Sequence, residues 1–136
     1  MNSEHPTAAG DRPKVAIVMR SYNDRPVIRQ TLERVLGQGY PNFELWNFDS
    51  SSQDGTLDII REYNVPERIQ LNDSKDYNPG RVLNEAVRTV PGEVLVFINS
   101  DATPESDDWL EQLIAPLADP GVGAVYGRQT ARPDCR

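Results

Sequence analysis

Continuous apolar runs alternate with stretches of helical periodicity along this chain, and this alternation constrains the fold more than any other feature. The clearest runs are Lys14–Met19, Phe43–Asp49 and Glu93–Ile98. The run Lys14–Met19 is continuous, which is typical of a strand buried on both faces of a parallel sheet. We therefore predict right-handed βαβ crossovers and an α/β, three-layer, Rossmann-like fold with a mostly parallel sheet.

The predicted helices lie between the strands and are identified by their apolar stripes. These stripes consist of Ile28, Leu32, Val35 and Leu36; Leu57, Ile60 and Tyr63; Leu83, Ala86, Val87 and Val90; and Leu110, Leu113, Ile114 and Leu117. Gly37 and Gly39 end the first helix, while Asn78-Pro79 and Thr103-Pro104 are N-terminal signals for the last two. Further short strands are expected at Arg68–Leu71 and Val122–Tyr126.

The length of 136 residues fits one domain. Residues 1–13 show no periodicity, so we interpret them as a disordered leader before a domain at residues 14–136. No apolar run approaches the roughly 20 residues of a membrane-spanning helix, and no secretory signal is present. Cys135 is the only cysteine, which excludes an internal disulfide and a cysteine-based metal site. A cytoplasmic location is the default expectation.

The charge distribution bears on the partners of the chain. A net charge of −7 argues against a nucleic-acid partner, which usually requires a basic surface. Between Arg88 and Arg128 there is no Lys or Arg, although seven acidic residues occur there. An anionic substrate at this stretch would need an intervening cation, and a divalent metal ion is the obvious one. Most of these acids, Asp101 excepted, are equally explained as a solvated helix face.

Two aspartates follow apolar strands and predict an enzyme site. Asp49 ends the run Phe43–Asp49, and Asp101 follows the run that ends at Ile98. In an open α/β sheet, the carboxyl ends of parallel strands line the crevice where ligands bind. The chain lacks both the Gly-x-Gly-x-x-Gly dinucleotide fingerprint and the Gly-x-x-x-x-Gly-Lys phosphate loop, so any nucleotide must be bound by other means.

Four motifs in this order resemble the nucleotide-binding half of family 2, GT-A-type glycosyltransferases. They are Ser21-Tyr22-Asn23 after the first strand; Asp49, Ser52, Asp54, Gly55 and Thr56 after the second; Gly80 with Asn84; and Asn99-Ser100-Asp101 at the family's Asp-x-Asp position. The segment Tyr126-Gly127-Arg128-Gln129 is similar to a subset resembling bacterial rhamnosyltransferases. The resemblance runs from about Lys14 to Arg136.

The resemblance implies a role for each matching residue. It assigns nucleotide binding to Ser21, Tyr22, Asn23, Asp49, Arg81 and Asn99, and metal binding to Asp101. Tyr22 would flank the base, Asp49 would bond its imide, Asn99 would reach a ribose hydroxyl, and Asp101 would hold Mn²⁺ or Mg²⁺ beside the diphosphate. Each also has an ordinary reading: Asp49 as a turn residue, Tyr22 as core, and Arg81 as an exposed helix arginine.

The implied function is inverting transfer of a sugar from a nucleotide-diphosphate donor to a glycan or lipid-linked acceptor hydroxyl, in bacterial polysaccharide or cell-surface glycan synthesis. The chain departs from the family at Ser50-Ser51 and Asn99. No catalytic base is identified, so we interpret the chain as a truncated part whose acceptor-binding half is absent. A noncatalytic doubly wound binding or signalling module is the alternative. Self-association, and peripheral membrane association of the full-length protein at the inner face of the membrane, are left open.

Overall fold

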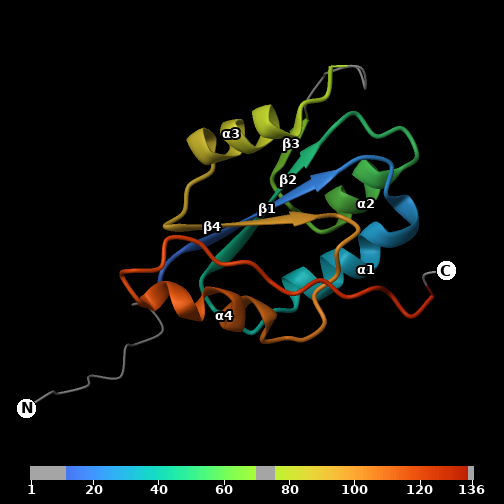
Figure 1. The fold of residues 1–136 in the computed structure, drawn as a ribbon. Helices are drawn as coiled ribbons and strands as arrows, with labels where there is room; N and C mark the ends of the chain where they lie inside the picture. Colours follow the sequence, from blue (N-terminus) through green and yellow to red (C-terminus); the bar gives the residue numbers. More distant parts are fainter. Residues whose placement is uncertain (1–11, 70–75, 135–136) are drawn as a thin grey trace, which may run out of the picture.

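A four-stranded sheet forms the centre of the molecule (Figure 1). The computed structural model describes residues 12–69 and 76–134. Within them the strands are β1 (Val15–Ser21), β2 (Phe43–Asp49), β3 (Glu67–Ile69) and β4 (Val94–Asn99), in the spatial order β3-β2-β1-β4. All three neighbouring pairs are parallel, which confirms the predicted α/β class and mostly parallel sheet.

Helices cover both faces of this sheet, so the molecule has three layers. The helices are α1 (Arg25–Leu36), α2 (Thr56–Glu62), α3 (Pro79–Thr89) and α4 (Trp109–Ile114), followed by a short 3₁₀ helix, η2 (Ala115–Ala118). Buried residues of α1, α2 and α4 share one apolar cluster on one face, and those of α3 form a second cluster on the other. In Figure 1, α3 lies above the sheet and α1 and α4 lie below it.

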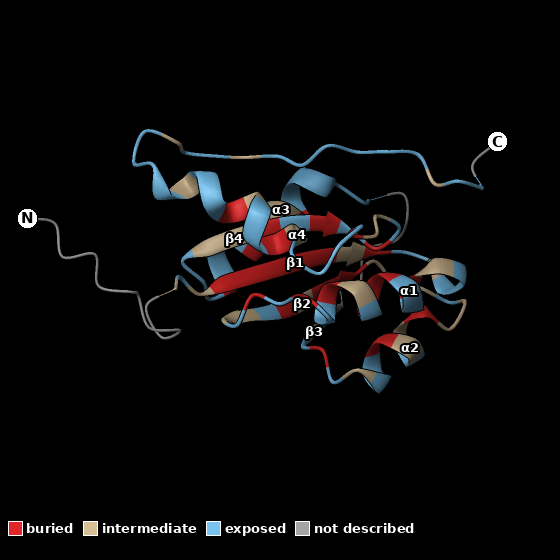
Figure 2. Ribbon diagram, turned by 90° about the horizontal axis from the view of Figure 1, so that it is seen from below, coloured by how far each residue is buried: buried red, intermediate tan, exposed pale blue. Residues whose placement is uncertain are grey.

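Strand β1 is the most deeply buried element, as its red colour in Figure 2 shows. Val15, Ile17 and Met19 pack in the cluster with α1, α2 and α4, while Ala16 and Val18 pack against α3. Successive strand residues point to opposite faces, so a strand covered on both sides must be apolar at every position. This double coverage explains the continuous apolar run read from the sequence.

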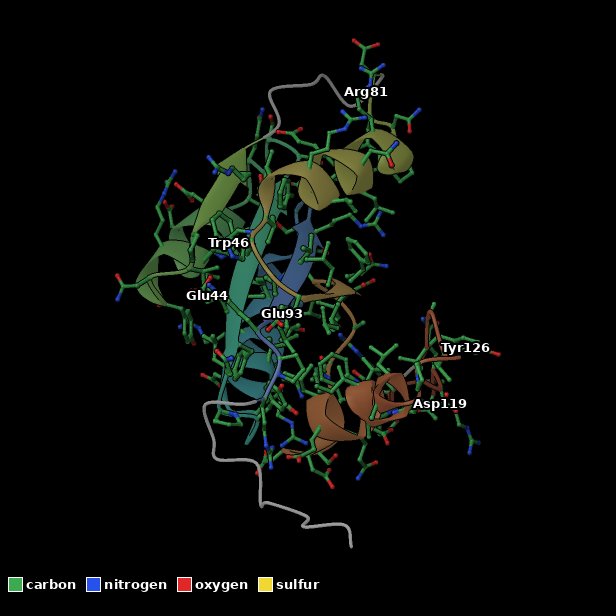
Figure 3. The ribbon with its side chains drawn as sticks, turned by 90° about the vertical axis from the view of Figure 1, so that its left-hand side faces the viewer. Glu44, Trp46, Arg81, Glu93, Asp119 and Tyr126 are labelled. Atoms are coloured by element: carbon green, nitrogen blue, oxygen red, sulfur yellow. The ribbon has the colours of Figure 1, made fainter. Side chains whose placement is uncertain are left out.

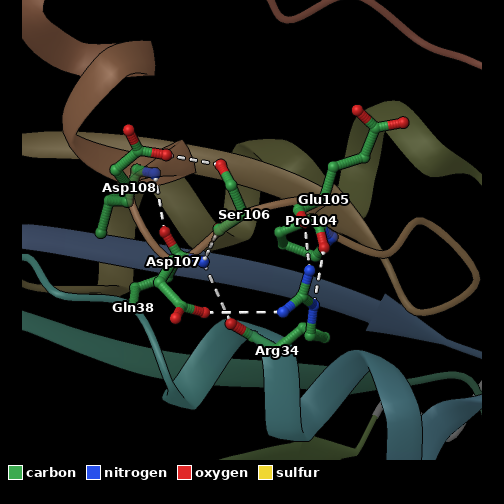
Figure 4. Close-up of polar contacts among 8 residues, drawn as sticks. Arg34, Gln38, Pro104, Glu105, Ser106, Asp107 and Asp108 are labelled. Atoms are coloured by element: carbon green, nitrogen blue, oxygen red, sulfur yellow. Dashed lines mark hydrogen bonds and ion pairs between the residues drawn. The ribbon is translucent and has the colours of Figure 1, made fainter.

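Helix α1 holds the segment that leads from β4 to α4 (Figure 4). The Nε2 of Gln38, just beyond α1, donates to the carbonyl of Ser106 at 2.7 Å, and its Oε1 accepts from the Leu110 amide at 2.9 Å. The guanidinium of Arg34 donates to the carbonyls of Pro104 and Glu105. Arg34 of α1 and Gln38 just after it thereby supply hydrogen bonds to backbone groups that have no partner within a helix.

These contacts explain why the helix predicted to begin at Thr103-Pro104 does not begin there. Residues 103–108 form a loop, and α4 starts at Trp109. Thr103 bonds through its Oγ1 to Thr31 of α1 at 3.1 Å instead of capping a helix. The prediction of a helix start at Thr103-Pro104 is therefore wrong, because Arg34 of α1 binds the Pro104 and Glu105 carbonyls that a helix would use.

The predicted strand at Val122–Tyr126 is also wrong. This stretch has no regular secondary structure, and Tyr126 is 97% exposed, on the outer side of α4 in Figure 3. Its Val122 amide donates to the Asp119 carbonyl, a bond within a turn and not between strands. A strand needs a hydrogen-bonded neighbour, and among the described residues none pairs with this segment.

Two smaller expectations are corrected by the packing of α3 and the length of β3. On α3 the buried positions are Val82, Ala86 and Val90, whereas the predicted core residue Val87 is 57% exposed. The residues that face the sheet repeat every four positions, and Val87 lies one position past that row. Strand β3 begins at Glu67, and residues 70 and 71 of the predicted strand lie outside the described residues.

The first described residues, Arg12 and Pro13, contact the rest of the domain. Residues 1–11 of the predicted leader lie outside the described residues, while Arg12 bonds to Glu111 and the Pro13 carbonyl accepts from the Tyr40 hydroxyl. The helices within residues 12–69 and 76–134 include none that is long and apolar enough to cross a bilayer.

The Gln38 contacts give a test of how the loop before α4 is held. We expect Gln38→Leu to lower the free energy of unfolding by about 1–3 kcal/mol, because it leaves the buried Leu110 amide without a partner and leaves the Ser106 carbonyl with only the Trp109 amide as donor. Gln30→Leu, on the exposed face of α1, is the control and should change stability by less than about 0.5 kcal/mol. Urea unfolding of both variants measures this, and equal losses would contradict it.

Candidate functional site

The carboxyl ends of β1, β2 and β4 meet at one edge of the sheet and carry most of the predicted site residues (Figure 1). In the strand register, Ser21 lies beside Asp49, and Arg20 lies beside Asn99. Asp101 follows in the turn after β4. Parallel pairing therefore gathers residues from three strands that are far apart in the sequence.

Asp49 is fully buried and joins the ends of β1 and β2. Its Oδ2 accepts from the hydroxyls of Ser21 and Ser52, both at 2.7 Å, and its Oδ1 accepts from the Ser52 amide at 2.7 Å. Hydrogen bonds to a carboxylate are among the stronger ones in proteins. Asp49 thus shapes the serine turn. The predicted bond from Asp49 to a base imide stays a prediction, and a base could reach this buried carboxylate only if the turn opened.

Asn23 ties the loop after β1 to the same serine turn. It has a left-handed backbone (φ 51°), a conformation that asparagine tolerates better than most residues. Its amide donates to the Ser52 Oγ at 2.8 Å, and its Oδ1 accepts from the Gln53 amide at 2.9 Å. Asn23 therefore fixes the geometry of the site. A direct contact between Asn23 and a nucleotide stays a prediction.

Asp24, which the sequence analysis did not single out, connects this loop to the turn after β4. Its Oδ2 accepts from the Tyr22 amide at 2.9 Å and from the hydroxyl of Ser100, a buried residue. Its own amide donates to the Thr56 Oγ1 at 2.9 Å. The side chain stands at the N-cap position of α1 without capping that helix. An N-cap aspartate that bonds elsewhere is visible only in three dimensions.

Asp54 holds the start of α2 against the start of α1. Its Oδ1 accepts from the amide and hydroxyl of Thr56, and its Oδ2 accepts from the Arg25 amide at 3.0 Å. These bonds, that from the Thr56 hydroxyl first, hold the pKa of the Asp54 carboxyl below its usual value. The aspartate of the Asp-Gly-Thr motif is thus a structural link between two loops.

Tyr22 and Arg81 differ in how they stand relative to this edge. Tyr22 is 50% exposed in the loop after β1, so its side chain is accessible to a ligand. Arg81 is exposed in the first turn of α3, where its backbone amide is capped by the Asn78 side chain. Figure 3 shows Arg81 at the top of the molecule, on α3. Its contact with a nucleotide stays a prediction.

Arg20 lies within the site, although the sequence analysis did not name it. Its Nη2 donates to the Asn99 Oδ1 at 2.6 Å, and its Nη1 lies 3.5 Å from the Tyr77 hydroxyl. The signal in the sequence was a single arginine at the end of an otherwise apolar strand. A charged residue at that position indicates the carboxyl edge of the sheet, where the strand becomes accessible to solvent.

Asp101 offers one exposed carboxylate for a metal ion. No described residue bonds to its side chain, while its carbonyl accepts from Arg132. Within residues 12–69 and 76–134, no group of three or more His, Cys, Asp or Glu side chains could enclose a metal. Mg²⁺ and similar hard ions are often held by one or two carboxylates together with phosphate oxygens and waters. Asp101 fits that arrangement and does not fit a metal held by protein alone.

A pocket of about 450 Å³ lies at the opposite edge of the sheet. It is lined by residues that precede β1 and β4 and by residues of α4 and η2, among them Arg12, Tyr40, Glu93 and Leu117. None of the predicted site residues lines it. The candidate site is therefore the open surface at the carboxyl edge, where the polar side chains converge, and not this more enclosed pocket.

The chain matches known proteins over most of its length. The family model described as glycosyl transferase family 2 matches residues 16–136. The O-antigen biosynthesis protein RfbC of Myxococcus xanthus is 32% identical over 83% of this chain. The O-antigen chain rhamnosyltransferase RfbN of Salmonella typhimurium is 30% identical over 89% of it. The chain spans only 9% and 38% of the lengths of these two relatives.

A similar fold occurs in solved structures of glycosyltransferases. The mannosyltransferase PcManGT from Pyrobaculum calidifontis, solved in complex with GDP-Man and Mn²⁺, aligns with a TM-score of 0.72 and 30% identity. The alignment covers 85% of this chain and 35% of that one. The predicted GT-A fold is thereby confirmed.

The bonds around Asp54 generate a prediction about acid stability. Because the pKa of Asp54 is lowered from 3.8 in the folded protein, its contribution is complete above that value and is lost as the pH falls below it. We expect Asp54→Asn to lower the melting temperature at about pH 6 and to lose less stability between about pH 4 and pH 2 than the wild type. Asp58→Asn, exposed on α2, should keep the wild-type pH profile. Thermal melts across this pH range measure the effect. If Asp54→Asn also kept the wild-type pH profile, the assigned contribution of Asp54 to acid stability would be contradicted.

Proposed function

Because the chain belongs to glycosyl transferase family 2, we propose that it binds a nucleotide-diphosphate sugar for inverting transfer of the sugar to an acceptor hydroxyl. The observation that carries this proposal is the convergence of Ser21, Asp49, Asn99 and Asp101 on one sheet edge, in the order that the family motifs require. The O-antigen relatives support a role in bacterial polysaccharide or cell-surface glycan synthesis.

The exposed residues of the site receive the donor. The exposed Tyr22 stacks on the base, and the loop that carries it is held by the hydrogen bonds of Asp24 and Asn23. Asn99 directs its amide nitrogen to a ribose hydroxyl, since its Oδ1 already accepts from Arg20. The buried residues Ser21 and Asp49 keep the turn in place, so the donor meets a surface that is largely formed before it binds.

Asp101 supplies the carboxylate for Mn²⁺ or Mg²⁺. The complex of PcManGT with Mn²⁺ and GDP-Man supports a divalent ion in this role. When bound beside a diphosphate, such an ion offsets its negative charge and favours its departure as a leaving group. The Asp101 carboxylate is available as a metal ligand because it is exposed and unpaired among the described residues.

Inverting transfer also requires a base that removes the proton of the acceptor hydroxyl. The three acids that follow Asp101 most closely are already engaged: Glu105 accepts from Thr130, Asp107 pairs with Arg34, and Asp108 accepts from Ser106 and Gln112. We assign the base to none of these three, and propose that residues outside 12–69 and 76–134 supply it. The acceptor is a glycan or lipid-linked hydroxyl.

A noncatalytic binding module is the second candidate. Asn99 in place of an aspartate leaves a single carboxylate near the metal position, and the neutral side chain bonds to Arg20. A relative that kept the fold and lost the chemistry would show the same features. Such a module would not bind nucleotides, which separates the two candidates.

Calorimetry with UDP, dTDP and GDP, each with and without Mn²⁺, tests the proposal. We expect one of them to bind with Mn²⁺ present, and Asp101→Ala to weaken that binding by about tenfold or more, since the metal loses its protein ligand. Asp58→Ala, on the exposed face of α2, is the control and should bind as the wild type does. Absence of binding to all three nucleotides would favour the noncatalytic module, and metal-dependent binding that survives in Asp101→Ala would contradict the role of Asp101.

A further inference from the structure

Arg20 presents a positive charge at the centre of the candidate site. It is half-buried at the end of β1, between β2 and β4, and its guanidinium reaches across to β4. There Nη2 donates to the Asn99 Oδ1 at 2.6 Å, and Nη1 approaches the Tyr77 hydroxyl at 3.5 Å. Both partners are neutral, and both approach from the α3 side of the sheet, on which Arg20 lies together with Asn99.

No carboxylate neutralises this charge among the described residues. The ion pairs in this part of the chain involve Arg12, Lys14, Arg29, Arg34 and Arg61, and none includes Arg20. A guanidinium stays protonated at every physiological pH and carries five N–H donors. Asn99 and Tyr77 use two of its groups, so further donors remain for a ligand.

The identity of residue 99 determines whether that charge is available. An aspartate at this position, 2.6 Å from the guanidinium, would form a charge-assisted pair with Arg20 and cancel its charge. Asparagine keeps the hydrogen bond, and so the position of the guanidinium, without the neutralisation. The site therefore loses one negative charge near the metal position and keeps one positive charge beside it.

The other arginines at this edge do not have this arrangement. Arg25 donates to the Asp54 carbonyl from the first turn of α1, and Arg132 donates to the Asp101 carbonyl from the C-terminal segment. Both bond to backbone oxygens at the rim of the site. Arg20 alone among these three belongs to a strand and is held by a side chain of the neighbouring strand.

We propose that Arg20 binds the diphosphate of the donor, and that Asn99 positions the guanidinium while leaving its charge free for that purpose. This inference rests on the proposed function. Guanidinium groups pair with phosphate oxygens through parallel N–H bonds, which suits a diphosphate that lies across the ends of β1 and β4. A metal ion held by a single carboxylate is bound weakly. Arg20 then supplies a further positive charge that helps to neutralise the diphosphate.

The test compares a nucleotide with its nucleoside, because only the nucleotide carries the phosphates. Binding of UDP, dTDP and GDP, and of uridine, thymidine and guanosine, is measured by calorimetry in Mg²⁺ and in EDTA. The variants are Arg20→Met, Asn99→Asp and, as a control, Arg88→Met, which removes an exposed arginine from α3.

We expect Arg20→Met to weaken nucleotide binding by about tenfold or more in both conditions and to leave nucleoside binding unchanged. Asn99→Asp should weaken binding in EDTA, where its carboxylate neutralises Arg20, and recover in Mg²⁺, where the same carboxylate serves the metal. Arg88→Met should match the wild type. Circular dichroism establishes that each variant is folded, and Asn99→Asp still decides the question if Arg20→Met does not fold.

The outcomes separate this inference from the function on which it rests. A wild-type chain that binds nucleotide, with Arg20→Met binding it equally well, overturns the role of Arg20 and leaves the proposed function intact. Equal losses of nucleotide and nucleoside in Arg20→Met also overturn it, since they would mean that Arg20 only supports the fold. A wild-type chain that binds no nucleotide overturns both.

Discussion

The buried carboxylate of Asp49 is the interaction on which the rest of the candidate site depends. It lies in the interior with no charged partner among the described residues, and an ionised carboxylate is costly there unless hydrogen bonds replace its hydration. Ser21 and Ser52 provide those bonds from β1 and from the following turn. The requirement to satisfy this one charge fixes the end of β1 against the turn after β2, and with it the position of Asn23.

The remaining loops are attached to that fixed point by other aspartates. Asp24 carries the connection to Ser100 after β4, and Asp54 connects the starts of α1 and α2. The family's acidic motifs therefore act here largely as hydrogen-bond acceptors for loop backbone and hydroxyl groups. The exposed polar residues Tyr22, Asn99 and Asp101 are what this framework presents to solvent, and Arg20 lies among them. We infer that the structural and ligand-binding carboxylates of the site are different residues.

Much of the fold, and part of the site, could be read from the residues. The apolar runs correctly predicted β1, β2 and β4, although β1 is buried on both faces while the edge strand β4 leaves Phe97 exposed, and Asn78-Pro79 correctly predicted the start of α3. The predictions at Thr103-Pro104 and Val122–Tyr126 were wrong because the structure of both segments depends on residues far away in the sequence. Arg34 and Thr31 bind the first segment, and no described strand pairs with the second. That the carboxyl ends of β1, β2 and β4 lie at one edge could be predicted from the parallel sheet. The Arg20–Asn99 bond was not, because it depends on the register between β1 and β4.

The most direct measurement is a map of backbone amide chemical shifts in the isotope-labelled chain as a nucleoside diphosphate is added with Mg²⁺. We expect the shifts to concentrate at Arg20–Asn23 and Asn99–Asp101, at the carboxyl edge of the sheet. Shifts confined to the pocket at the opposite edge, around Arg12, Tyr40 and Leu117, would contradict it. They would mean that the polar convergence at the carboxyl edge serves the fold and that the ligand binds elsewhere.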